Sequence, residues 1–102
     1  MSGPLKQITK CMGYEQIASG LDAANSLDVP VIDAEGNRMR PTMAIIIPET
    51  QAVRWRDDGT DPTGSIGMPL AVGVSLIYDG DLTKIRFIEQ AASAKLNISY
   101  FA

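Results

Sequence analysis

The second part of the chain alternates between apolar and polar residues with the period of two that marks half-buried strands. In the clearest case Val53 and Trp55 share one face, and Arg54 and Arg56 share the other. No window after residue 42 repeats its apolar positions every 3.6 residues, so we expect no helix there. The segments that alternate in this way are residues 52–56, 85–88 and 96–100.

One segment departs from this alternation because every residue in it is apolar. Residues 43–47 read Met-Ala-Ile-Ile-Ile, with three β-branched side chains in succession. A short apolar run of this kind is typical of a strand that is covered on both faces. We therefore predict a buried central strand that Pro48 ends, because proline cannot donate to a sheet ladder.

The first forty residues carry weaker periodicity. Residues 14–18 alternate and are predicted to form a strand, while residues 21–29 fit either a short helix or a strand with a bend. Val29 precedes Pro30 and is therefore expected to be extended. We assign residues 1–20 to an N-terminal arm or edge strand and residues 21–102 to the main domain.

The spacing of the predicted strands indicates the fold class. Six or seven short strands follow one another, most of them about 8 to 14 residues apart, with turn residues between them. Asp79–Gly80 has the composition of a hairpin turn. The pattern predicts an all-β protein, an antiparallel, jelly-roll-like β-sandwich with an extended N-terminal arm. Trp55, Phe87 and Tyr100 are expected to fill its core.

Composition narrows the possible chemistry. The 102 residues suffice for one small domain, and they include no histidine and a single cysteine, Cys11. A Ser-His-Asp triad, a Cys-His pair, an imidazole base and a His-ligated metal are thereby excluded. One cysteine can form neither an internal disulfide nor a four-cysteine zinc site. We therefore expect a protein that is not an enzyme and that holds no cofactor or metal.

Charge and hydropathy indicate which partners to expect. Nine Lys and Arg residues against twelve Asp and Glu residues give a formal net charge of -3. That balance disfavours a dedicated nucleic-acid binder, which normally has a basic face. No apolar run approaches the length of about 18 residues that spans a membrane. The first residues lack the pattern of a secretory signal, so we expect synthesis in a reducing cytoplasm.

The densest polar cluster lies in residues 54–61. Asp57, Asp58 and Asp61 offer carboxylates that suit calcium. An EF-hand loop that starts at Asp57 requires a glutamate at its twelfth position, where this chain has Met68. The cluster is therefore interpreted as a turn in which carboxylates accept hydrogen bonds from loop N–H groups near the arginines.

Basic residues on neighbouring strands suggest a contact surface. Arg54, Arg56, Lys84 and Arg86 are predicted to share an outward face. A stripe of this kind with nearby aromatic residues fits single-stranded nucleic acid, but Trp55 is expected on the opposite face. Contact with an acidic protein surface is the favoured interpretation. The predicted protein-contact residues are Arg54, Arg56, Asp57, Asp58 and Arg86.

Several segments of the second half resemble small virion proteins of tailed bacteriophages. The longest of these segments is residues 53–70, VRWRDDGTDPTGSIGMPL, and shorter ones follow in the same order. The resemblance covers about half of the chain and implies a small β-sandwich that decorates or cements a capsid. It brings no catalytic residues with it. The shorter segments are residues 78–82, 85–88 and 94–100.

The resemblance implies where and with what the protein works. The partner would be the major capsid protein, the site the capsid surface of the virion, and the assembly a homo-oligomer, either a dimer or a trimer. Neither nucleic acid nor a membrane is expected as a partner. Two alternatives stay open, namely a head-fibre base or tail component, and a carbohydrate-binding β-sandwich module, which requires an exposed aromatic platform.

Overall fold

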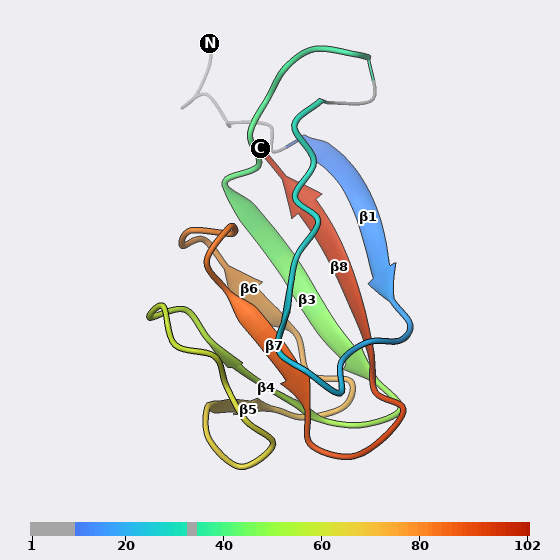
Figure 1. Ribbon diagram of the computed structural model, residues 1–102. Helices are drawn as coiled ribbons and strands as arrows, with labels where there is room; N and C mark the ends of the chain where they lie inside the picture. The colour runs from blue at the N-terminus through green and yellow to red at the C-terminus, as the bar shows by residue number, and fades with distance from the viewer. Residues whose placement is uncertain (1–9, 33–34) are drawn as a thin grey trace, which may run out of the picture.

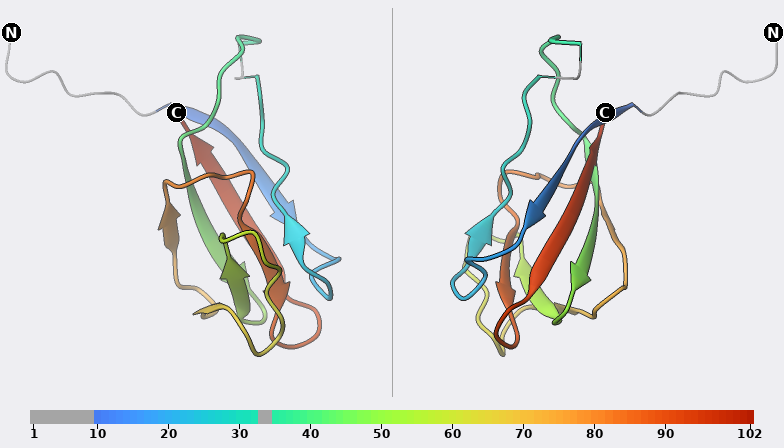
Figure 2. Two further views of the ribbon diagram at one scale, coloured as in Figure 1. Left: turned by 60° about the vertical axis from the view of Figure 1, so that its left-hand side comes forward. Right: turned by 90° about the vertical axis from the view of Figure 1, so that its right-hand side faces the viewer.

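The computed structural model describes residues 10–32 and 35–102, and this part of the chain forms eight strands and no helix. The strands belong to two four-stranded antiparallel sheets that face each other (Figures 1 and 2). The predicted all-β sandwich is confirmed. The strands are β1 (Cys11–Ile17), β2 (Asn25–Ser26), β3 (Met43–Glu49), β4 (Val53–Arg56), β5 (Met68–Leu70), β6 (Leu76–Tyr78), β7 (Arg86–Glu89) and β8 (Lys95–Phe101).

The strand order is that of a jelly roll. Sheet A has the order β1-β8-β3-β6 and sheet B the order β2-β7-β4-β5. The chain forms one long antiparallel ribbon that is folded back on itself at its middle. The strand pairs along this ribbon are β1·β8, β2·β7, β3·β6 and β4·β5. The pairs β3·β8 and β4·β7 form where this ribbon rolls up into two sheets. This topology confirms the jelly-roll-like prediction.

The turn at Asp79–Gly80 joins the two sheets and is not a hairpin. β6 pairs with β3 in sheet A, whereas β7 pairs with β4 and β2 in sheet B. The hairpin expectation was therefore wrong. A turn signal reports only a local reversal of the chain, and whether the next strand pairs with the last depends on the rest of the sheet.

The core lies between the sheets and is filled by one side of each alternating strand. Val53, Phe87, Ile46 and Leu96 are fully buried, and Tyr100 is 1% exposed. Trp55 is half-buried and packs against this core from sheet B. The predictions that Phe87 and Tyr100 lie in the core and that Trp55 and Val53 share the inner face are confirmed. Trp55 was also expected to fill the core, but it is only partly buried and packs at the margin of the core.

β3 continues through Pro48 to Glu49, so the prediction that Pro48 ends the strand was wrong. Pro48 is opposite Leu96 of β8, and its carbonyl accepts a hydrogen bond from the Gly73 N–H at 2.9 Å. In an extended strand the N and C=O of one residue point to the same side. The missing N–H of Pro48 therefore faces Gly73, and the ladder with β8 loses nothing.

The outer side of β3 is not covered. Ala44 and Ile46 are fully buried, whereas Met43, Ile45 and Ile47 are half-buried on the opposite side. The prediction of burial on both faces was wrong in this respect. The strand is central in sheet A, as predicted, but no third layer of described residues packs on the outer face of the sheet.

Two strands at the sheet edges come from the described residues before Pro41. Residues 11–17 are the edge strand β1, and the helix considered for residues 21–29 is replaced by a turn and the two-residue strand β2. The predicted arm falls largely on residues 1–9, which lie outside the described residues. The connection from β2 to β3 extends beyond the end of the sheets near the C-terminus (Figures 1 and 2).

Candidate interaction surface

The predicted arginine stripe lies on the outer face of sheet B. Arg56 is directly opposite Arg86 in the β4·β7 pair, and Arg54 is opposite Ile88. All three arginines are half-buried. In β4, Arg54 and Arg56 lie on the side opposite to the buried Val53. The predicted separation of faces in β4 is confirmed. Like charges directly opposite each other destabilise a sheet unless a counter-charge is close.

Arg54 fastens the loop between β4 and β5. Its Nη1 donates to the Gly67 carbonyl at 2.9 Å, and its Nε is buried without a partner among the described residues. Gly67 has a φ of +140°, and a Cβ there would lie 3.2 Å from the Trp55 carbonyl oxygen. Glycine is therefore required for the loop to pack against β4, and Arg54 acts mainly as a structural residue.

Arg56 and Asp58 form a two-point ion pair at the end of β4. The Arg56 Nε donates to Asp58 Oδ1 at 3.0 Å, and Nη2 donates to Oδ2. Asp58 Oδ1 also accepts from the Thr60 N–H. The hydrogen bond from Arg56 lowers the pKa of Asp58 below its usual range. This is the turn with a capping carboxylate that the sequence predicted.

The three carboxylates of the acidic loop do not form a metal site. No group of three or more acidic, cysteine or histidine side chains in residues 10–32 and 35–102 is placed to hold a metal ion. Asp57 instead accepts a hydrogen bond from the Tyr78 hydroxyl, and Asp58 is occupied by Arg56. The calcium interpretation therefore has no geometric support.

A shallow mixed-charge pocket adjoins the outer face of sheet B. It has a volume of about 400 Å³ and is lined by residues of the acidic loop together with Lys84 and Arg86. Three carboxylates, Asp57, Asp58 and Asp61, balance Arg56, Lys84 and Arg86. Of the predicted contact residues, all but Arg54 belong to this patch. Below we call these six residues the mixed-charge patch.

Asp57 also links the two sheets. The Tyr78 hydroxyl of sheet A donates to Asp57 Oδ2 at 2.7 Å, and the Tyr78 ring meets Trp55 edge-on with 5.9 Å between ring centroids. Burial, with a smaller contribution from the Asp57 hydrogen bond, raises the pKa of Tyr78 to about 12. A Cβ at Gly80 would lie 2.4 Å from the Tyr78 hydroxyl oxygen, so the loop fits only with glycine.

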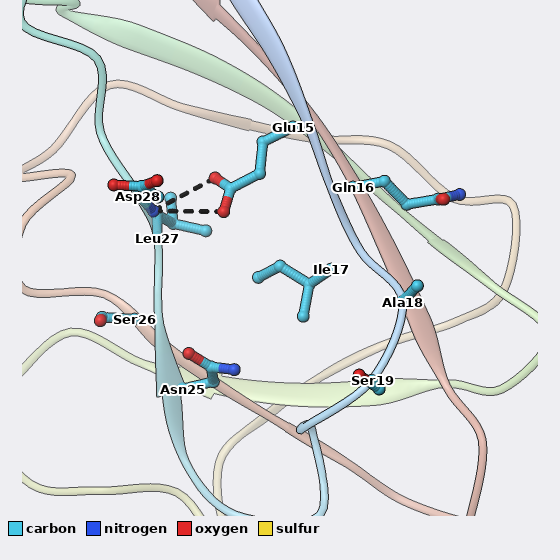
Figure 3. Close-up of a pocket in the computed structure, with 9 residues that line it drawn as sticks. All are labelled: Glu15, Gln16, Ile17, Ala18, Ser19, Asn25, Ser26, Leu27 and Asp28. Carbon is cyan, nitrogen blue, oxygen red and sulfur yellow. Dashed lines mark hydrogen bonds between the residues drawn. The ribbon is translucent and has the colours of Figure 1, made fainter.

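A groove opens at the opposite side of the sandwich, between the edge strands β1 and β2 (Figure 3). Its volume is about 580 Å³, and Ile17 and Leu27 point into the space between the two strands. Apart from Ala18, its remaining lining is polar and includes Glu15, Asn25 and Ser26. It contains no basic or aromatic side chain.

Glu15 closes this side of the sandwich. Its Oε1 accepts from the Tyr100 hydroxyl at 2.6 Å and from the Asp28 N–H at 3.1 Å. The second interaction joins β1 of sheet A to the segment that follows β2 of sheet B (Figure 3). Burial and the hydrogen bond to Glu15 raise the pKa of Tyr100.

The sequence did not identify Glu15 or the role of Asp57 in the Tyr78 link. A signal was present, because a buried tyrosine hydroxyl almost always has a partner and both Tyr78 and Tyr100 occupy inward-facing positions. The partner of each could not be read from the pattern. Glu15 lies 85 residues from Tyr100 and Asp57 lies 21 residues from Tyr78, so only the folded chain brings them together.

No family model, curated protein or solved structure matches this chain. The described part of the chain also contains no helix that is long and apolar enough to cross a membrane.

Proposed function

We propose that the chain is a bacteriophage capsid decoration protein that binds the major capsid protein and stabilises the shell. The observation that carries the proposal is a jelly roll of about one hundred residues whose sheet B has a patterned, mixed-charge outer face. Jelly rolls serve widely as capsid and lectin domains. A fold alone does not define a function, so the contact chemistry of this face must support the rest.

The mixed-charge patch suits a protein partner better than nucleic acid. Its three cations are balanced by three carboxylates, and two of the groups already form the Arg56–Asp58 pair. A patch with both signs can meet a complementary protein surface, where charge arrangement sets orientation and specificity. A phosphate backbone would instead be repelled by Asp57, Asp58 and Asp61.

The shell itself compensates for a small contact. One outer face of this domain is too small for a tight interface between two single proteins. A capsid presents many copies of the same site, so a weak single contact still gives high occupancy when the protein is abundant. Synthesis in the host cytoplasm followed by addition to the outer capsid surface is consistent with this way of working.

Sedimentation with capsids tests the proposal. Shells assembled from the major capsid protein of the same virus are mixed with the purified protein and pelleted. We expect saturable binding, and a loss of at least tenfold in affinity for Arg86→Glu, which changes the charge of the patch. Arg38→Glu, the same charge reversal at an exposed site away from the patch, is the matched control. Absence of wild-type binding to these shells contradicts the proposal.

One observation favours a second candidate, a carbohydrate-binding module. Trp55 is half-buried and packed against Tyr78, so it cannot act as a platform, but Tyr14 on sheet A is 65% exposed. Gln16, Asn97 and Glu49 form a hydrogen-bonded row beside it. Binding of soluble glycans that broadens the NMR signals of Tyr14 and is lost in Tyr14→Ala would support this module and would weaken the capsid proposal.

A further inference from the structure

The outer face of sheet A carries apolar and uncharged polar side chains over most of its length and is open to solvent. Ile77 is 64% exposed and Tyr14 is 65% exposed, and the apolar side chains between them are half-buried. The only charges on the paired strands of this face, Lys95 and Glu49, are opposite each other at one end. Across the sheet the rows are Cys11–Phe101–Met43, Tyr14–Ser99–Ile45–Ile77, Gln16–Asn97–Ile47 and Lys95–Glu49.

We propose that this face binds a second copy of the chain in a symmetric, face-to-face dimer whose twofold axis runs parallel to the strands, between β8 and β3. Rotation about this axis places each row of side chains over the same row of the partner. The order of the strands across the sheet is reversed in the partner. β8 then lies over β3 of the second copy, and β1 lies over β6. The proposal does not depend on the capsid function, because the contact needs no shell protein.

The order of the strands makes the face complementary to itself under this axis. Lys95 of each copy meets Glu49 of the other, so two ion pairs form at one end of the interface. Tyr14 of each copy meets Ile77 of the other, which covers the two most exposed large side chains of the face. Aligned sheets pack with their strands about 30° apart, and the long Lys and Glu side chains can span the resulting offset.

The alternative twofold axis, perpendicular to the strands, is disfavoured by charge. It places each strand over the same strand of the partner and reverses the rows, so that Lys95 lies over Phe101 and Glu49 lies over Met43. Each charge would then lose water and gain no opposite charge from the second copy, whereas the axis parallel to the strands supplies one. The position of the single charged row thus selects one of the two aligned arrangements.

The size of the face sets the expected strength. Three strands of seven residues and one of three give a flat area of roughly 400 Å² per copy, or about 800 Å² in total. Stable interfaces bury about 1,200–2,000 Å². The dimer is therefore expected to be weak and reversible in isolation, with a dissociation constant on the order of micromolar or weaker.

Charge reversal with the two single variants tests the arrangement. Sedimentation-velocity ultracentrifugation is run on the full chain from low micromolar to near-millimolar concentration. Lys95→Glu places two carboxylates against two carboxylates in its own dimer, and Glu49→Lys places ammonium groups against ammonium groups. We expect each variant alone to associate at least tenfold more weakly than wild type. An equimolar mixture of the two is expected to associate again, because every facing pair then has opposite charges.

The mixture separates contact between copies from effects within one chain. Lys95 and Glu49 also face each other across β8·β3 inside each copy, and mixing cannot repair that internal pair. Arg38→Glu and Asp22→Lys are controls with the same charge changes at exposed sites off the face and should dimerise like wild type. A wild type that stays monomeric over the whole range, or a mixture that fails to recover, overturns the proposal. If the wild-type protein dimerises but does not bind capsids, only the proposed function is contradicted.

Discussion

The two outer faces of the sandwich have the same architecture and opposite chemistry. Each lies on a four-stranded sheet of the same rolled ribbon, and each takes every second residue of its strands. Sheet A presents Ile45, Ile77 and Tyr14, whereas sheet B presents Arg54, Arg56 and Arg86. Large apolar side chains exposed on one face mark an interaction site, whereas a balanced charged face is stable in water by itself. On this difference rest the two proposals, self-association through sheet A and contact with another protein through sheet B.

The largest expected effect is on the free energy of unfolding, and it differs between the inner and outer sides of β3. Ile46 is fully buried, so Ile46→Ala should lower the free energy of unfolding by about 2–5 kcal/mol. The adjacent Ile45 faces outward, and Ile45→Ala should cost less than about 1 kcal/mol while weakening dimerisation. Urea denaturation followed by the fluorescence of Trp55, the only tryptophan, measures both. Equal losses in the two variants would show that the outer face of sheet A is covered within one chain.

The polar links between the sheets should affect stability without affecting either face. Tyr100→Phe removes one hydrogen bond to the Glu15 carboxylate and should lower the free energy of unfolding by about 1.5–3 kcal/mol. Tyr78→Phe removes the bond to the exposed Asp57 and should cost about 1 kcal/mol. Capsid binding and dimerisation are measured in parallel under conditions where both variants are folded. A change in either one would mean that a link also shapes an interaction surface.

Alkaline pH should weaken the Tyr78 link in a defined window. The pKa of Tyr78 is raised to about 12 in the folded protein, above the value of about 10 for an unfolded chain. A raised folded pKa means that the stabilisation is complete below about pH 10 and is lost as the pH rises through about 12. Urea denaturation between pH 9 and about 12 measures this loss. Tyr78→Phe should lose less stability over the same range, and an identical pH profile for both proteins would refute the assignment.

The smallest expected effect concerns salt and distinguishes the two faces directly. Raising the salt concentration from about 0.05 M to about 0.5 M shortens the screening length severalfold and should weaken capsid binding through the mixed-charge patch. Dimerisation through sheet A should change less, because only one row of that face is charged. Both equilibria are followed by sedimentation in the same buffers. A dimer that is more sensitive to salt than capsid binding would reverse the assignment of the two faces.

The sequence predicted the parts of the fold that depend on local alternation. A period of two places Val53 and Trp55 on one face of the strand and Arg54 and Arg56 on the other. The inward position of Phe87 follows from the same period. The exposed outer side of Ile45 and Ile47 could not be predicted, because an apolar run reads the same whether its second face is covered by this chain or by another. Pro48 was misread because its tolerance depends on which neighbour its backbone nitrogen faces.

The candidate surface was predicted in part for the same reason. Arg56, Asp57, Asp58 and Arg86 come together because the β4·β7 register is consistent with the alternation of both strands. Arg54 shares that face, but its hydrogen bond to the Gly67 carbonyl depends on how a loop returns to β4. The self-complementary rows of sheet A required the strand order β1-β8-β3-β6, which a short-range pattern does not contain.

A cryo-electron microscopy reconstruction of the intact virion tests the central assignment most directly. We predict jelly-roll density on the outer surface of the capsid, with the sheet B patch of Arg56, Asp58 and Arg86 turned toward the major capsid protein. The outer face of sheet A should point away from the shell, toward a second copy. Density for this chain at the tail, with none on the capsid surface, would contradict the decoration function.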